Sequence, residues 1–93
     1  VRKGNVLSDI SIFGEKGEFI EAEAISEGSI IDKPIKRIRF PKGSLLVCII
    51  RNGSVIIPHG ENFIRSGDRI ILFAVRHAIK KLEKLLTVKL RMF

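Results

Sequence analysis

The residues of this chain that could carry out chemistry are few and far apart. Two histidines, His59 and His77, occur without a serine or cysteine nucleophile at a recognisable spacing. The Ser-Gly-Asp sequence at 66–68 indicates a turn, and it lacks the strand-turn-helix context of a nucleophile elbow. Cys48 lies in an apolar, β-rich run, which is typical of a buried and inert thiol. The sequence therefore predicts that the chain is not an enzyme.

Two acidic residues are placed so that they could hold a cation. Glu21 and Glu23 alternate with apolar residues, so they share one face of an expected strand. Two carboxylates on one face could supply the oxygen ligands that hard cations such as calcium prefer. The same two residues could instead form the solvent face of the strand or pair with basic residues of a partner. The sequence fixes no third carboxylate nearby, and both interpretations stay open.

Alternating and apolar runs predict the strands that must position these residues. The segment 18–25 alternates in polarity and is expected to be a half-buried strand. Residues 44–51 form an apolar strand that we expect to be covered on both faces. Asn52–Gly53 predicts a two-residue type I′ turn, because that turn requires positive φ at both residues. Further strands are expected at 54–57 and 69–75, a loop at 59–68, and a first strand could lie at 6–13.

Two helices are expected around these strands. Asp32 can accept hydrogen bonds from the first N–H groups of a turn and Pro34 fits its first position, so a short helix is predicted over 33–39, ended by Pro41. A C-terminal amphipathic helix follows the last strand, and the remaining residues, 87–93, form a basic tail that could add an edge strand. The fold class predicted is α+β, a small and mainly antiparallel sheet with one short helix and one amphipathic helix. The apolar stripe of that last helix is Ala78, Ile79, Leu82, Leu85 and Leu86, and its polar face is Lys80, Lys81 and Lys84.

Composition and charge narrow the function further. The chain has 93 residues, 45% of them apolar, which fits one small globular domain with a thin margin of stability. Its longest apolar run, residues 45–50, is far shorter than the roughly 20 residues of a membrane-spanning helix, and no signal sequence is evident, so a cytoplasmic location is expected.

Residues 76–93 hold six basic residues and one acidic residue, whereas 15–32 hold six acidic residues and one basic residue. A block at 33–42 holds five basic residues and no acidic one. This uneven pattern favours association of like subunits, or an acidic partner, over a uniform nucleic-acid surface.

Six short sequences, taken in their order along the chain, resemble the TrkA-C (RCK-C) family, the C-terminal regulatory domain of Trk-type potassium-uptake regulators. The resemblance covers 18–86, and residues 1–17 before it resemble the lead-in to such a domain, which implies a fragment of a longer protein. The six sequences are Glu27–Gly28–Ser29, Asp32–Lys33–Pro34–Ile35, Phe40–Pro41–Lys42–Gly43, Ile50–Arg51–Asn52–Gly53, Ile57–Pro58–His59–Gly60 and Gly67–Asp68–Arg69–Ile70–Ile71–Leu72–Phe73–Ala74.

The resemblance implies a small antiparallel sheet with helices, usually dimeric and joined to a Rossmann-type nucleotide-binding domain. It implies a non-catalytic domain for ligand sensing and oligomerisation, which controls cation transport from the cytoplasmic side of the cell membrane. The implied partners are a second copy of the domain and the membrane subunit of a potassium channel or transporter. The chain lacks a Gly-x-Gly-x-x-Gly turn after a strand, so NAD is expected only in a separate Rossmann-type domain and no cofactor is expected here.

The resemblance also implies candidate site residues. Family members that bind cyclic dinucleotides hold the ligand between two subunits, where arginine pairs with phosphate and apolar side chains sandwich the base. Other members use carboxylates of this domain for cations, which makes Asp68 a candidate beside Glu21 and Glu23, although Asp68 could equally bond the backbone of the turn that Gly67 permits. A solvated loop is the alternative to the dinucleotide site. The residues implied to line that site, with a small phosphate-bearing ligand, are Arg37, Ile38, Arg39, Ile57, Pro58 and His59.

Three functions remain open at this stage. The first is a regulatory domain of potassium transport, and the second is the same module serving another transporter, an exchanger or a transcription regulator. The third is a generic basic nucleic-acid-binding domain, suggested by an isoelectric point near 10.1. The chain contains no tryptophan or tyrosine on which bases could stack, which makes nucleic acid an unlikely partner.

Overall fold

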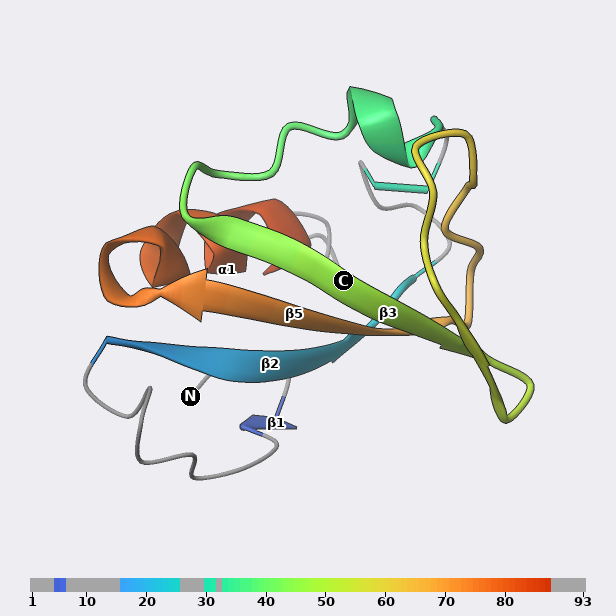
Figure 1. Cartoon of the computed structure of the whole chain (residues 1–93), viewed down its shortest axis with the longest axis horizontal. Helices are drawn as coiled ribbons and strands as arrows, with labels where there is room; N and C mark the ends of the chain where they lie inside the picture. Colours follow the sequence, from blue (N-terminus) through green and yellow to red (C-terminus); the bar gives the residue numbers. More distant parts are fainter. Residues whose placement is uncertain (1–4, 7–15, 26–29, 32, 88–93) are drawn as a thin grey trace.

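The computed structural model describes residues 5–6, 16–25, 30–31 and 33–87 of the chain. In this part of the chain, five strands form one sheet in the order β1-β2-β5-β3-β4, and every neighbouring pair is antiparallel (Figure 1). The predicted α+β fold is confirmed. The elements are β1 (Asn5–Val6), β2 (Gly17–Glu23), the 3₁₀ helix η1 (Ile35–Arg37), β3 (Ser44–Arg51), β4 (Ser54–Ile56), β5 (Arg69–Val75), the 3₁₀ helix η2 (Arg76–Ala78) and α1 (Ile79–Thr87).

The central strand of the sheet is β5, in which every residue after Arg69 is apolar. It pairs with β2 along its whole length, from Gly17 opposite Val75 to Glu23 opposite Arg69. On its other side it pairs with β3, with a bulge between Leu46 and Cys48. Its alternate residues Ile70, Leu72 and Ala74 are fully buried. A strand paired on both edges and apolar on its inner face anchors the small core.

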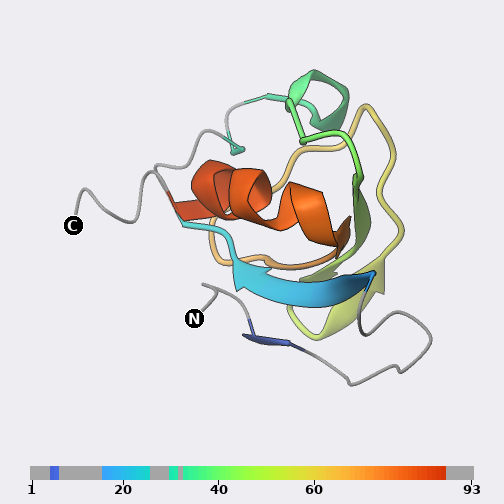
Figure 2. The same cartoon turned by 90° about the vertical axis from the view of Figure 1, so that its left-hand side faces the viewer.

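The helix α1 covers one face of the sheet (Figure 2). Ala78, Ile79 and Leu82 project into the core, where Leu82 is fully buried beside Leu72 of β5 and Ile49 of β3. The lysines of α1 lie on its exposed side. The amphipathic pattern thus predicted both the helix and its buried face. None of the helices in the described part of the chain has the length and apolar content that crossing a membrane requires.

The hairpin between β3 and β4 has the predicted turn. Asn52 has a φ of 52° and Gly53 a φ of 80°, so both residues occupy the left-handed region that a type I′ turn requires. The limits of β3 and β5 match the predicted strands, and β4 ends one residue earlier than expected.

Three expectations need correction. The short helix is only a 3₁₀ turn over Ile35–Arg37, because the backbone is extended at Pro34 before it and at Ile38 after it. The strand β3 is not covered on both faces within the chain, since Leu45 is 62% exposed. Cys48 is only partly buried, because it lies on that same uncovered side of the sheet. Other predicted features lie outside the described residues: the strand at 6–13 except Val6, the turn at 27–29, the role of Asp32, and the tail after Thr87.

Candidate functional site

The short helix η1 and the loop between β4 and β5 are joined, although they are far apart in the sequence. This β4–β5 loop comprises residues 57–68. The N–H of Ile35 donates to the carbonyl oxygen of Asn62 at 2.8 Å, and the N–H of Lys36 donates to that of Gly60 at 3.0 Å. The Lys36 ammonium also lies 2.6 Å from the carboxylate of Glu61. In Figure 1 the two segments lie together above the right-hand end of the sheet. The structure therefore brings together the two segments from which the dinucleotide site was predicted.

The β4–β5 loop is held in shape by its own hydrogen bonds. The side-chain oxygen of Asn62 accepts the N–H of His59 at 2.8 Å. In return the N–H of Asn62 donates to the carbonyl oxygen of His59 at 3.0 Å. These two bonds close a tight turn over 59–62 and leave the backbone carbonyl oxygens of Gly60 and Asn62 pointing toward η1. The loop thus has a defined shape that its own hydrogen bonds fix.

Five of the six residues predicted for the dinucleotide site are accessible. Arg37, Arg39, Ile57 and His59 are exposed and Pro58 is partly buried. Ile57 is 66% exposed. The side chain of Ile38, in contrast, is 8% exposed and belongs to the core. On either side of this buried residue, Arg37 at the end of η1 and Arg39 after it are both exposed.

Asp68 forms a buried ion pair that spacing alone did not reveal. Its two carboxylate oxygens accept hydrogen bonds from Nε of Arg51 at 2.9 Å and from Nη2 of Arg51 at 2.7 Å. The backbone N–H of Arg65 donates a third bond to the same carboxylate at 2.8 Å. The hydrogen bonds from Arg51 are the main cause that lowers the pKa of Asp68, against the opposing effect of burial. The same bonds raise the pKa of Arg51. Asp68 is therefore a charged structural link between β3, β5 and the β4–β5 loop.

The three carboxylates considered as cation ligands do not come together. Glu21 forms an ion pair with Arg69 on the neighbouring strand, Glu23 is exposed at the end of β2, and Asp68 is occupied by Arg51. In the segments that the structure describes, no group of three or more histidine, cysteine or acidic side chains is arranged to hold a metal ion. This arrangement favours the interpretations without a bound cation: Glu21 and Asp68 pair with arginines, and Glu23 lies on the solvent face of its strand.

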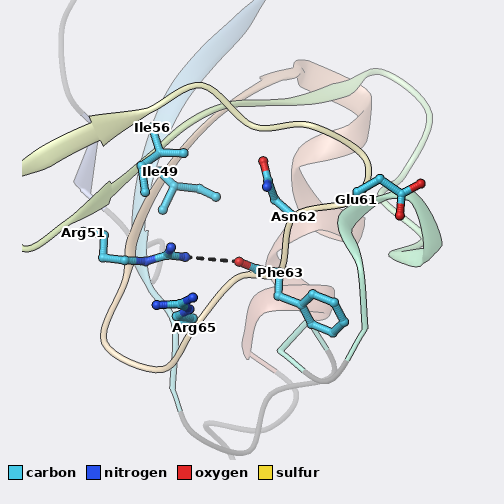
Figure 3. Close-up of a pocket in the computed structure, with 7 residues that line it drawn as sticks. All are labelled: Ile49, Arg51, Ile56, Glu61, Asn62, Phe63 and Arg65. Carbon is cyan, nitrogen blue, oxygen red and sulfur yellow. Dashed lines mark hydrogen bonds between the residues drawn. The ribbon is translucent and has the colours of Figure 1, made fainter.

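A pocket of about 250 Å³ lies on the inner side of the β4–β5 loop (Figure 3). Its residues come from β3, β4 and the loop, and sequence reasoning did not select it. The one signal for this pocket in the sequence is Arg51, the basic residue before the Asn-Gly turn. The sequence does not show which groups lie next to Arg51, and only the tertiary structure does. The lining residues are Ile49, Arg51, Ile56, Glu61, Asn62, Phe63 and Arg65.

The family model of the TrkA-C domain matches residues 20–87. The "Trk system potassium uptake protein TrkA homolog 2" of Methanosarcina mazei is 45% identical over 75 residues, which are 81% of this chain and 17% of that protein. The "Trk system potassium uptake protein TrkA" of Azorhizobium caulinodans is 37% identical over 93 residues, 100% of this chain and 20% of that protein. This chain thus spans about a fifth of the length of these relatives.

Two solved structures share the fold. An RCK domain solved with cda superposes with a TM-score of 0.62 at 26% identity, covering 73% of this chain and 96% of that chain. The RCK_C domain dimer of S. agalactiae BusR in complex with c-di-AMP superposes with a TM-score of 0.65 at 17% identity, covering 84% of this chain and 99% of that chain. At 17% identity the second likeness concerns the fold alone.

Proposed function

The chain belongs to the TrkA-C domain family, and we propose that it is the ligand-sensing and oligomerisation domain of a cytoplasmic regulator of potassium transport. The observation that carries this proposal is its identity of 45% and 37% to two Trk system potassium uptake proteins. The role is non-catalytic. NAD would bind only to a separate Rossmann-type domain, and the membrane subunit of a potassium transporter would be the partner at the inner face of the membrane.

The ligand proposed is a cyclic dinucleotide such as cyclic di-AMP. The RCK domain that was solved with cda is 26% identical to this chain, and it supports the same ligand class here. The exposed guanidinium groups of Arg37 and Arg39 offer planar donors that match phosphate oxygens. Ile57 and Pro58 provide an apolar surface for the base beside them, and His59 lies at its end. Ile38 contributes its backbone, since its side chain is in the core.

Two subunits would complete this site. All of the accessible candidate residues lie on the surface of the chain. A single subunit would therefore cover a flat ligand on one side only. Cyclic di-AMP has two equivalent phosphates and two equivalent bases, which suits a two-fold interface that supplies each group twice. Large apolar side chains that the single chain leaves open, Leu45, Val55 and Ile57, are 62%, 65% and 66% exposed. A homodimer would cover such a surface.

Calorimetry with cyclic di-AMP tests this proposal, together with sedimentation of the free and the saturated protein. We expect a dimer at micromolar protein concentration and one ligand per dimer. Arg39→Ala should weaken binding by about tenfold or more, since a hydrogen bond to a charged group is worth about 1.5–3 kcal/mol. Arg65→Gln, which removes an exposed arginine elsewhere, is the matched control and should bind normally. A monomer that binds no cyclic di-AMP below about millimolar concentration would refute the ligand and the shared site together.

The other functions are less well supported. The BusR structure comes from a different host protein, so the same module in another regulator stays an alternative that the full-length sequence would decide. A general nucleic-acid-binding role has no stacking surface of tyrosine or tryptophan to support it.

A further inference from the structure

The pocket beside the β4–β5 loop has an excess of hydrogen-bond donors (Figure 3). Arg51 uses Nε and Nη2 for Asp68 and for the carbonyl oxygen of Phe63, and Nη1 makes no hydrogen bond to the described residues. The guanidinium of Arg65 is exposed and finds no hydrogen-bond acceptor in the same part of the chain. The side-chain amide of Asn62 accepts from His59 through its oxygen, which leaves its NH₂ group as a donor. Three side chains thus offer unused donors to one space.

The two acceptors next to Arg51, the Asp68 carboxylate and the Phe63 carbonyl oxygen, are already engaged. The carboxylate of Asp68 accepts three hydrogen bonds and its side chain is 3% exposed, so it lies behind Arg51. The carboxylate of Glu61 is bound to Lys36, and in Figure 3 it points away from the two arginines. The carbonyl oxygen of Phe63 accepts from Arg51 at 3.1 Å. Because Asp68 neutralises only one of the two guanidinium groups, the end of the pocket at Arg51 and Arg65 keeps a positive charge.

The opposite wall of the pocket is apolar. Ile49 of β3 pairs with Ile56 of β4 across from Arg65 (Figure 3). Ile56 is partly exposed and forms the accessible part of this wall, whereas Ile49 is fully buried behind it. A volume of about 250 Å³ corresponds to roughly eight water molecules at about 30 Å³ each. A second hollow of about 200 Å³, beside Ser66 and Gly67, also borders Arg51 and Arg65, so their guanidinium groups can be approached from two sides. The pocket therefore favours a ligand with an anionic group, which would lie at the cationic donors, and an apolar group, which would lie at the isoleucine end.

We propose that this pocket is a binding site for a small organic anion, a phosphate monoester or carboxylate with a short apolar group. The anionic oxygens bind Arg65, Nη1 of Arg51 and the amide NH₂ of Asn62, and the apolar group packs on the accessible part of Ile56. The site lies within one chain, so it is separate from the dinucleotide site proposed between subunits. The hydrogen bond that the N–H of His59 donates to the side-chain oxygen of Asn62 connects the two sites, because it links the pocket to the segment that would hold the dinucleotide.

A titration of the 93-residue chain with phenyl phosphate, followed by amide NMR, tests the site. We expect shifts at Asn62, Arg65 and Ile56, and weaker binding of inorganic phosphate, which cannot use the apolar wall. Arg65→Gln should weaken phenyl phosphate binding about tenfold or more. Asn62→Asp keeps the oxygen that accepts from His59 but adds a negative charge, so it should also lose binding while the loop stays folded.

Arg39→Gln is the matched control for charge. It removes an exposed arginine outside the pocket and should leave phenyl phosphate binding unchanged, whereas it should impair cyclic di-AMP. Equal weakening by Arg39→Gln and Arg65→Gln would show non-specific attraction to a basic protein and would overturn the proposal. Absence of shifts at the pocket residues would overturn it as well. Arg65→Gln is expected to leave cyclic di-AMP binding unchanged. The experiments therefore distinguish failure of the pocket proposal from failure of the dinucleotide proposal.

Discussion

Replacement of Arg51 by alanine is expected to be one of the most destabilising single changes to this domain. It removes both hydrogen bonds from Arg51 to Asp68, at 2.9 and 2.7 Å, and leaves a carboxylate that is 3% exposed with only the N–H of Arg65. Removing one partner of a buried pair costs about 3–5 kcal/mol. Because Arg51 itself is 22% exposed and water can reach the site, we expect the lower end, about 3 kcal/mol. For a domain of this size that corresponds to a fall in Tm of about 12–24 °C.

Urea and thermal unfolding of Arg51→Ala measure this loss, and Arg69→Ala provides a matched control. Arg69 also pairs with a carboxylate across neighbouring strands, but its side chain is 59% exposed, so its removal should cost about 1 kcal/mol or less. In the Arg51→Ala background, the further change Asp68→Asn should cost much less than it does in the unmodified chain, since the stranded charge is then gone. Equal losses in Arg51→Ala and Arg69→Ala would refute the inference that burial makes the first pair special.

Two further predictions concern pH and the hairpin. The lowered pKa of Asp68 contributes stability that is present above the unfolded value of about 3.9 and is lost as pH falls through the folded value. Urea midpoints measured downward from about pH 4 should therefore fall more steeply for the unmodified chain than for Arg51→Ala, and parallel curves would contradict this assignment. Gly53→Val should cost roughly 1–2 kcal/mol through positive φ alone, because an added Cβ at Gly53 meets nothing within 4 Å. Gly53→Asn should be milder in thermal unfolding, and equal midpoints for the two variants would contradict a backbone cause.

The positions of the strands and of the last helix could be predicted because they depend on local patterns. The apolar run of β5 and the apolar stripe of α1 each show in the sequence which residues are buried in the fold. Asn52–Gly53 shows its turn equally directly, since few other residue pairs tolerate two consecutive positive φ angles. The ordered motifs also predicted the TrkA-C family, which the family match over residues 20–87 confirms.

The short helix and the core position of Ile38 could not be predicted in the same way. The sequence shows alternating polarity around Ile38 but not which residues pack against its side chain. It therefore does not reveal that Ile38 belongs to the core and not to a ligand surface. The helix predicted over 33–39 is only three residues long, because the backbone is already extended at Ile38, whose side chain lies in the core. Local propensity does not show what holds this segment, since the β4–β5 loop that accepts the N–H groups of Ile35 and Lys36 lies more than 20 residues away along the chain.

The strands β2 to β5, the hairpin turn and the amphipathic helix can be predicted from the sequence, because each of them depends on residues that are neighbours in the chain. The family can be predicted because six such local motifs occur in order. The partners of the charged residues, in contrast, are visible only in the folded chain. The tertiary structure placed Arg51 on Asp68, which is 17 residues away, and Lys36 on Glu61, which is 25 residues away. It also left the donors of Arg65 and Asn62 facing a common pocket. The physical reason is that an ion pair or a pocket is formed by sheet register and loop closure, and the spacing of residues along the chain specifies neither of them.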